Sequence, residues 1–295
     1  MTASTAPSPS RVAVITGASS GIGKATAIAF ARLGWQVIGV GRNPERSAAA
    51  ETEIRAAAAN GATVAMLRGD FELMADVAKV ADGIAALTDR VDILINNAGN
   101  MRDRKGLTAE GNEITFASNH LAAVLLTRRL MPLLRAAAAD QPAGTVRVLA
   151  VSSSGHEYSP PADWDDLQMT GEKYHFGQAY CFAKLANIQF TRELGRRAAA
   201  DGIVAQVMHP GVIHSNFVSH TSPETQAYMA TLNGNPPEHA AQTLLWMATA
   251  PETGVDSGRY FHAMQEVPAS DAASNDADAA RLWDESEKIL TGLGY

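Results

Sequence analysis

Cysteine is almost absent from this sequence, because the 295 residues include only Cys181. One cysteine can form neither an intrachain disulfide nor a cysteine-rich metal site, and disulfides are typical of oxidising compartments. The eight histidines also follow none of the short spacings that bind zinc, such as H-E-x-x-H. We therefore expect no metal ion, and we expect the protein to work in a reducing compartment, the cytoplasm.

Positive charge is scarce as well, with 24 Lys and Arg against 31 Asp and Glu and a net charge of −7. Nucleic-acid binding depends on clustered cations that release counterions, and the cationic clusters here hold only two or three residues. No uninterrupted apolar run approaches the roughly 18 residues that indicate a membrane-spanning helix. We expect neither a nucleic-acid partner nor a membrane partner.

Short apolar runs alternate with segments of helical period from Arg11 onward. The runs predict strands over Val12–Ile15, Gln36–Val40, Thr63–Leu67, Val91–Ile95, Thr145–Val151, Val204–Met208 and Tyr260–Phe261. The periodic segments predict helices over Ile22–Leu33, Glu45–Ala59, Met74–Leu87, Glu113–Ala138 and Phe176–Ala200. Such alternation requires crossover connections, so we predict an α/β fold with a Rossmann-type, doubly wound parallel sheet and helices on both faces.

The domain organisation follows from the same alternation. Residues 1–10 are rich in Ser, Thr and Pro and lack the features of a signal peptide, so we predict a disordered tail there. Because we find no repeat and no second core, we predict a single domain over 11–295. Two insertions, 155–173 and 213–237, follow strands, where open α/β sheets bind ligands, and we expect them to wall a substrate pocket. Their apolar residues could line that pocket or pack as ordinary helix; these are Phe217, Tyr228, Met229 and Leu232.

A glycine-rich turn follows the first predicted strand and opens the first helix. Gly17 allows the sharp turn, Gly21 lets backbone N–H groups approach a pyrophosphate at the positive helix end, and Gly23 lets helix and strand pack closely. The spacing is G-x-x-x-G-x-G, and its place after the first strand favours a dinucleotide site over a plain turn. The candidate cofactor-binding residues are Gly17, Ser19, Ser20, Gly21, Ile22 and Gly23.

The end of the second strand bears on the type of cofactor. Enzymes selective for NAD usually place an acid there to bind the ribose 2′-hydroxyl. This sequence has Gly41 and Arg42 instead, and an arginine offers a cation to a 2′-phosphate. We predict a preference for NADP(H), with NAD(H) also accepted; the other interpretation of Arg42 is an exposed arginine at a helix start.

Tyr180 and Lys184 lie four residues apart in a predicted helix, so they share one face of it. A tyrosine with its ordinary pKa of about 10 is a poor acid-base catalyst at neutral pH, and a nearby cation lowers that pKa by roughly 1 to 3 units. Most such pairs are surface pairs. Tyr180 and Lys184 become a candidate catalytic pair only together with other motifs.

Those motifs resemble the short-chain dehydrogenase/reductase family, in order and over nearly the whole chain: Thr16 to Gly23, Asn96-Asn97-Ala98-Gly99, Ser152-Ser153 and Tyr180 to Lys184. The resemblance implies a seven-stranded parallel sheet in the order 3-2-1-4-5-6-7. It implies that Tyr180 is the general acid and base, and that Lys184 binds the nicotinamide ribose and lowers the tyrosine pKa. By the same resemblance, Ser153 bonds the substrate oxygen and Asn119 holds a water in a proton relay.

The resemblance also implies further cofactor contacts. Asn97, Ala98 and Gly99 would support the adenosine, and Asp70 would contact the adenine ring. The segment after the sixth strand would contact the nicotinamide through Pro210, Gly211 and Val212, with Ser215 in place of the threonine that usually reaches the carboxamide.

Four segments resemble one branch of this family, the retinol dehydrogenases and their WW-domain-containing relatives. These segments are 180–187, 209–212, 257–261 and 280–283. The 27 residues from Ser153 to Tyr180 (180 − 153) fit that branch. We expect no membrane anchor and no WW module, and an apolar small-molecule alcohol or carbonyl as the substrate.

The sequence also bears on functions other than oxidoreduction. A Ser/His/Asp hydrolase is unsupported, because the serines at 152–154 lack the G-x-S-x-G elbow. Two alternatives stay open: a non-catalytic cofactor-sensing or scaffolding protein, and an epimerase or dehydratase of the extended branch. The family pairs through its two long helices, here 113–138 and 176–200, so the resemblance implies a homodimer or homotetramer. The retinol-dehydrogenase-like branch often departs from this pairing, so a monomer stays open.

Overall fold

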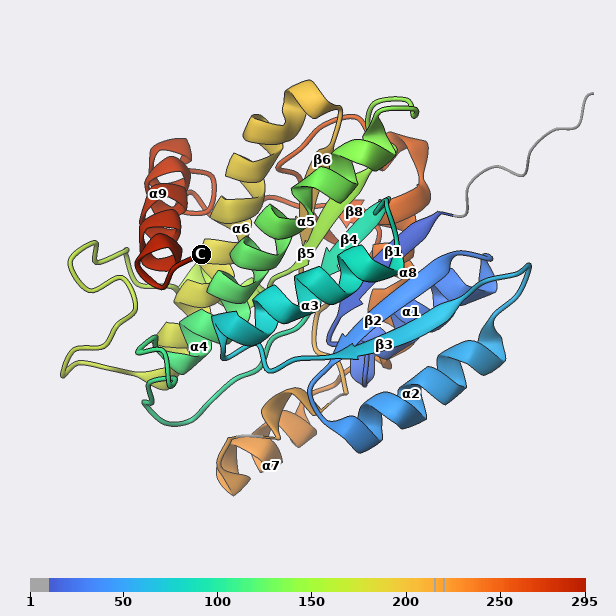
Figure 1. The fold of residues 1–295 in the computed structure, drawn as a ribbon. Helices are drawn as coiled ribbons and strands as arrows, with labels where there is room; N and C mark the ends of the chain where they lie inside the picture. The colour runs from blue at the N-terminus through green and yellow to red at the C-terminus, as the bar shows by residue number, and fades with distance from the viewer. Residues whose placement is uncertain (1–10, 215, 220) are drawn as a thin grey trace, which may run out of the picture.

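The computed structural model describes residues 11–214, 216–219 and 221–295, and one sheet runs through this part of the chain. The strands of the described residues are β1 Val12–Thr16, β2 Gln36–Gly41, β3 Val64–Arg68, β4 Ile93–Asn96, β5 Arg147–Val151, β6 Val204–Met208, β7 Tyr260–His262 and β8 Gln265–Glu266. Their order is β3-β2-β1-β4-β5-β6-β7-β8 (Figure 1). The predicted Rossmann-type fold and the order of its first seven strands are confirmed. The tail predicted at 1–10 lies outside the described residues.

The expectation of seven strands is wrong by one, because β8 pairs antiparallel with β7. The two strands are joined by Ala263 and Met264, whose φ angles of 47° and 59° are those of a tight hairpin turn. Such turns usually carry Asn-Gly or Asp-Gly, and here neither residue signals the turn. With two exposed residues, β8 also lacks any apolar alternation that would predict it.

The helices cover both faces of the sheet. They are α1 Gly21–Arg32, α2 Pro44–Ala57, α3 Met74–Leu87, α4 Ile114–Phe116, α5 Ala122–Ala138, α6 Phe176–Ala198, α7 Pro223–Thr231, α8 Pro237–Thr249 and α9 Asp276–Gly292. The helix predicted over 113–138 is interrupted, since a π-helical turn at Ala117–Leu121 separates α4 from α5. Throughout the described residues, we find no helix with both the length and the apolar character needed to traverse a bilayer.

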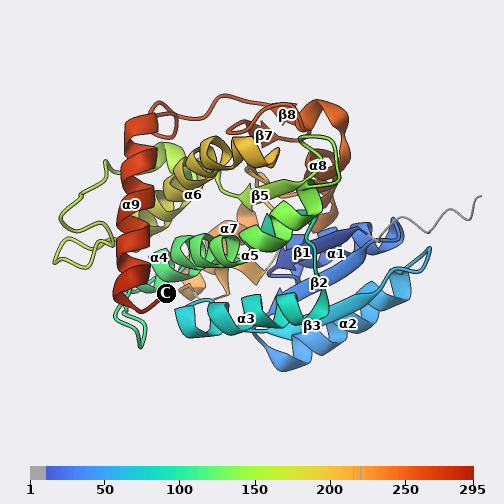
Figure 2. The same cartoon turned by 45° about the horizontal axis from the view of Figure 1, so that its top comes forward.

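The hydrophobic core is split by the sheet into two layers. Along β1, Val12 and Val14 face a layer built with α3, α5 and α6, while Ala13 and Ile15 face a layer built with α1, α2 and α8. This two-residue period is the geometry of a strand, and both of its faces are buried because helices lie on each side. Figures 1 and 2 show α9 lying against α6, on the outside of the first layer.

Two local sequence signals explain where helices begin and end. Gly34 follows α1 with φ of 85°, a left-handed conformation that glycine adopts without strain. Asn43 precedes α2, and its side-chain oxygen accepts a hydrogen bond from the backbone N–H of Arg46 at 2.9 Å. Gly34 thus follows the end of α1 just before β2, and Asn43 starts α2 just after it.

Candidate active site

The glycine-rich turn after β1 is tied to the loop after β4 by a buried threonine. The hydroxyl oxygen of Thr16 accepts hydrogen bonds from the backbone N–H groups of Asn97 and Ala98 at 3.0 and 2.9 Å. The Asn97 side chain donates in turn to the Thr16 carbonyl oxygen at 2.7 Å. Two loops that are 80 residues apart in the sequence (97 − 17) therefore form one rigid edge.

The glycines of the turn are required by its geometry. Gly17 and Gly21 have φ of 71° and 53°, and a Cβ atom at Gly23 would overlap the carbonyl oxygen of Gly17. Ser20 precedes α1 without a side-chain capping bond, so its side chain does not cap the N–H groups of the first helical turn. An uncapped helix N-terminus behind a glycine turn fits the pyrophosphate of a dinucleotide.

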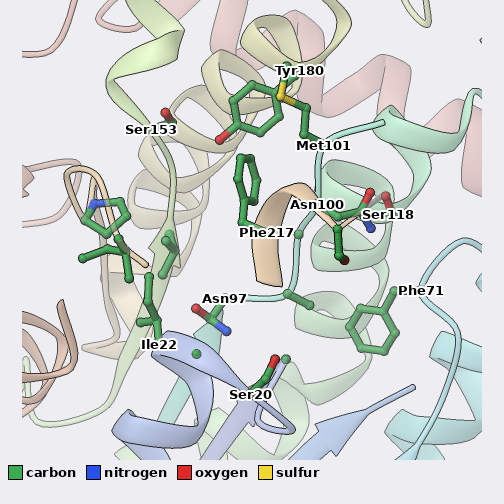
Figure 3. Close-up of a pocket in the computed structure, with 18 of the residues that line it drawn as sticks. Ser20, Ile22, Phe71, Asn97, Asn100, Met101, Ser118, Ser153, Tyr180 and Phe217 are labelled. Atoms are coloured by element: carbon green, nitrogen blue, oxygen red, sulfur yellow. The ribbon is translucent and has the colours of Figure 1, made fainter. Parts of the chain in front are cut away.

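A pocket of about 610 Å³ runs from this turn across the carboxyl ends of the strands. Most of the predicted site residues line it: Gly17, Ser19, Ser20, Gly21, Ile22, Arg42, Asp70, Asn97, Ala98, Gly99, Ser153, Tyr180, Lys184, Pro210, Gly211 and Val212. Figure 3 shows Ser20 and Ile22 at one end and Tyr180 at the other. Gly23 and Asn119 lie behind the lining, and Ser215 lies outside the described residues.

Tyr180, Ser153 and Lys184 meet at one end of the pocket. The hydroxyl of Tyr180 points toward Ser153 (Figure 3), and the Lys184 Nζ lies 5.7 Å from the centre of the tyrosine ring. Lys184 is buried, and its Nζ donates to the Val151 carbonyl oxygen at 3.3 Å. Its own carbonyl oxygen accepts from the Ser152 hydroxyl at 2.7 Å, which fixes α6 against the end of β5.

Burial controls the protonation of this pair. It raises the pKa of the Tyr180 phenol, against a smaller lowering by the hydrogen bond with Ser153. It also lowers the pKa of Lys184 to about 8. Below that pH Lys184 is charged, and its charge favours the ionised form of Tyr180.

Asn119 lies in the π-helical turn, behind Gly99. Its side-chain nitrogen donates to the carbonyl oxygens of Asn100 and Thr115 at 3.0 and 2.9 Å. Its Oδ1 is buried without a hydrogen-bond partner in the structure. A Cβ atom on Gly99 would lie 2.6 Å from that Oδ1 and 3.0 Å from the Lys184 Nζ, so the three residues converge around a position that only glycine leaves open.

The opposite end of the pocket adds two charged residues, Glu72 and Arg102, to the predicted Arg42 and Asp70. Arg42 lies 3.2 Å from a carboxylate oxygen of Glu72 and 3.7 Å from one of Asp70. Glu72 also forms an ion pair with Arg102, which comes from the loop after β4. The second strand carries no acid, as predicted, but the loop after β3 brings two acids to Arg42. No local motif predicts this, because the pairing joins three separate loops.

The pocket wall near Tyr180 is apolar. The ring of Phe217 lies 5.3 Å from that of Tyr180, and Met101, Ile213 and Met229 also line the pocket. Of the apolar residues singled out in the second insertion, Phe217 and Met229 belong to the lining, whereas Tyr228 is 64% exposed. Residues 155–173 of the first insertion do not belong to the lining of this pocket, whereas the flanking residues Ser154 and Gly177 do.

Comparisons with known proteins agree with this geometry. The family model described as short chain dehydrogenase matches residues 11–162. Human retinol dehydrogenase 13 is 35% identical over 289 residues, covering 96% of this chain and 85% of the human one. Human retinol dehydrogenase 12 is 36% identical over 283 residues, covering 96% and 87%.

Solved structures share the fold as well. The crystal structure of an uncharacterized protein from Mycobacterium paratuberculosis has a TM-score of 0.73 and 31% identity, covering 95% of this chain and 93% of that one. The Pseudomonas aeruginosa RhlG/NADP active-site complex has a TM-score of 0.67 and 24% identity, covering 86% and 95%, which is a likeness of fold.

Proposed function

The chain belongs to the short-chain dehydrogenase/reductase family, in its retinol-dehydrogenase-like branch, and from this premise we propose that it uses NADP(H) to interconvert an apolar alcohol and its aldehyde or ketone, with Tyr180 as general acid and base. The observation that carries the proposal is the convergence of Ser153, Tyr180 and Lys184 at one end of a pocket whose other end is the glycine turn. Membership of the family makes the protein an NAD(P)-dependent oxidoreductase that acts on alcohols and carbonyls.

The proposed reaction assigns each side chain a task. The bound nicotinamide supplies or accepts the hydride. In reduction Tyr180 donates its proton to the substrate oxygen, and in oxidation it takes that proton back. The Ser153 hydroxyl donates a hydrogen bond to the same oxygen and stabilises the charge that develops there. Both groups already face each other in the structure.

Lys184 and Asn119 complete the proposed proton path. A protonated Lys184 favours the ionised form of Tyr180, and its ammonium can donate to the nicotinamide ribose. The unpaired Oδ1 of Asn119 faces the same gap beside Gly99, and a water there would find both an acceptor and a donor. We assign Asn119 the role of holding this water.

The preference for NADP(H) rests on the cations at the adenosine end. Arg42 and Arg46 both line that part of the pocket, and guanidinium groups match a 2′-phosphate in geometry and charge. Asp70 and the segment 97–99 also line the pocket, and we assign them to the adenosine. The segment 210–212 also lines the pocket, and we assign it, together with Ser215, to the nicotinamide.

An activity screen with wild-type protein tests the proposed reaction. NADPH and NADH should be followed separately with all-trans-retinal, nonanal and cyclohexanone, and NADP⁺ with the matching alcohols. We expect turnover of the apolar aldehydes with NADPH. Tight NADPH binding with no turnover of any carbonyl would contradict the proposal and favour a cofactor-sensing role.

Tyr180→Phe tests the assignment of the general acid. Loss of a positioned acid-base group costs about 100- to 10,000-fold in rate, while NADPH affinity should stay near that of the wild type. Tyr174→Phe is the matched control, because the Tyr174 hydroxyl bonds Glu113 outside the pocket and its loss should leave turnover unchanged. Near-normal turnover in Tyr180→Phe would refute the mechanism.

A further inference from the structure

His156 is a buried histidine three residues after Ser153, and the proposed mechanism gives it no task. It lies in the short 3₁₀ helix Ser154–Tyr158 and is 1% exposed. It does not line the pocket. A buried imidazole needs hydrogen-bond partners, so its contacts show what it holds in place.

Both ring nitrogens of His156 have partners. Nδ1 lies 2.8 Å from the carbonyl oxygen of Ser153, and Nε2 lies 3.2 Å from the backbone nitrogen of Ser270. A backbone N–H can only donate, so Nε2 must be the unprotonated, accepting nitrogen of a neutral imidazole. The proton therefore sits on Nδ1, which donates it to the Ser153 carbonyl.

Tyr260 from β7 closes the other side of the imidazole. Its ring meets the imidazole edge-on, with 5.1 Å between the ring centres, and its hydroxyl lies 3.4 Å from Nδ1. Ser270 belongs to the segment between β8 and α9. His156 thus joins the loop of the candidate catalytic serine to the C-terminal part of the chain.

The backbone around Ser153 decides where its hydroxyl points. The Ser153 Oγ accepts a hydrogen bond from the Gly155 N–H at 3.0 Å, and the Ser153 carbonyl accepts from both the backbone N–H and the Nδ1 of His156. With its oxygen engaged in this way, the hydroxyl is free to donate its proton toward Tyr180 or a substrate. Loss of the Nδ1 bond would leave the Ser153 carbonyl held only by the backbone N–H of His156, so the carbonyl and with it the hydroxyl would shift.

We propose that His156 is a positioning residue, which fixes the Ser153 hydroxyl for the substrate oxygen by donating Nδ1–H to the Ser153 carbonyl and accepting the Ser270 amide at Nε2. This inference rests on the proposed function. It adds a residue that acts through Ser153 and that makes the geometry of the active site depend on the segment between β8 and α9.

Three variants separate the two hydrogen bonds of His156. Asn places an amide N–H at the position of Nδ1, Gln reaches the position of Nε2, and Leu keeps neither bond. A misplacement of about 1 Å at a reacting group costs about 100-fold, so we expect kcat to fall about 10- to 100-fold in His156→Leu and His156→Gln. His156→Asn should restore most of kcat. NADPH affinity, measured by fluorescence titration, should stay within about twofold of the wild type in all three, because His156 touches no cofactor-lining side chain.

The control variant is Gln189→Leu. Gln189 is also buried, and its Nε2 donates to the Ala272 carbonyl oxygen at 2.9 Å, in the same C-terminal segment but without contact to Ser153. It should lower the melting temperature and leave kcat unchanged. If His156→Leu does not fold, the comparison of His156→Asn with His156→Gln still tests the proposal, because both variants place the same polar amide group in the site.

A double-mutant cycle with Ser153→Ala decides whether His156 acts through the serine. If it does, His156→Gln should lower kcat strongly when Ser153 is present and hardly at all in the Ser153→Ala background, since that background has no hydroxyl left to position. Equal losses in both backgrounds, or an unchanged kcat in His156→Gln, would overturn the proposal. The assay uses NADPH and nonanal, or retinal if nonanal is not turned over. Absence of turnover in the wild type would instead mean that the proposed function is wrong.

Discussion

The charge of Lys184 should set the pH dependence of alcohol oxidation. Oxidation needs the ionised form of Tyr180, and the Lys184 Nζ lies 5.7 Å from the centre of the tyrosine ring. With the phenolate charge placed at the ring centre and an effective dielectric constant near 20, two unit charges attract by ~3 kcal/mol, which corresponds to about two pKa units. The pKa of Lys184 is about 8, so its charge is present below that pH. Lys184→Met should therefore raise the apparent pKa of the oxidation by about two units.

The assay is the pH profile of kcat/KM for the alcohol at saturating NADP⁺. Saturation matters because the variant also loses the proposed contact of Lys184 with the ribose. At a pH below both apparent pKa values, the ionised fraction of Tyr180 and the oxidation rate should be about 100-fold lower in Lys184→Met.

Lys79→Met serves as the control for this experiment. Lys79 pairs with Asp76 on the surface of α3, and its side chain is 76% exposed, so the pH profile should not change. An apparent pKa that stays the same in Lys184→Met, with NADP⁺ still bound, would refute the electrostatic role of the lysine.

Three further predictions concern the cofactor site and the core. Gly23→Ala should abolish the rise in melting temperature that NADPH produces, because the added methyl group collides with the Gly17 carbonyl oxygen; a normal rise would refute the tight turn. Arg42→Ala should weaken NADPH binding by about 10- to 100-fold, the cost of one or two charged hydrogen bonds, and leave NADH binding unchanged in titrations; equal losses would contradict a role in selectivity. Burial lowers the pKa of His120 to about 3. Between pH 6.5 and pH 3 the imidazole is therefore protonated in the unfolded chain but not in the folded protein. On acidification through this range, the free energy of unfolding should fall by up to about 1.4 kcal/mol per pH unit. Urea titrations should show a shallower fall in His120→Gln.

Features that depend on neighbours in the chain could be predicted from the sequence. The glycine turn, the cap at Asn43 and the apolar run Val12–Ile15 are local, and the structure places each of them as expected. The strand order followed from the family resemblance and is confirmed. The eight strands of the described residues form one sheet covered by helices, and the single domain over 11–295 stays a prediction.

Features that depend on convergence of distant segments could not be predicted. Glu72 meets Arg42 and Arg102 only because three loops share one edge of the sheet. The bond from His156 to Ser270 spans 114 residues. A sequence pattern carries no information on such pairs, because each partner would be an ordinary residue on a surface loop.

Helix α9 bears on the predicted oligomer in the same way. Trp283 of α9 stacks on Phe190 of α6 with 5.4 Å between the ring centres, and Glu287 pairs with Arg128 of α5. Helix α9 therefore covers part of both helices through which the family resemblance predicts subunit pairing. A dimer or tetramer formed through that face would require α9 to move or to become part of the interface. The homo-oligomer stays a prediction, and its interface must include or displace α9.

The protonation states of Tyr180 and Lys184 bear on the direction of the proposed reaction. Burial raises the pKa of Tyr180 and lowers that of Lys184, so in the protein alone the phenol is neutral throughout the neutral range. A neutral phenol is a proton donor, which is the form that reduction requires. Oxidation requires the ionised phenol, and a positive charge nearby stabilises that form. The neutral phenol therefore has the form that the proposed reduction uses, and the proposed role of Lys184 is to stabilise the phenolate that the oxidation would use.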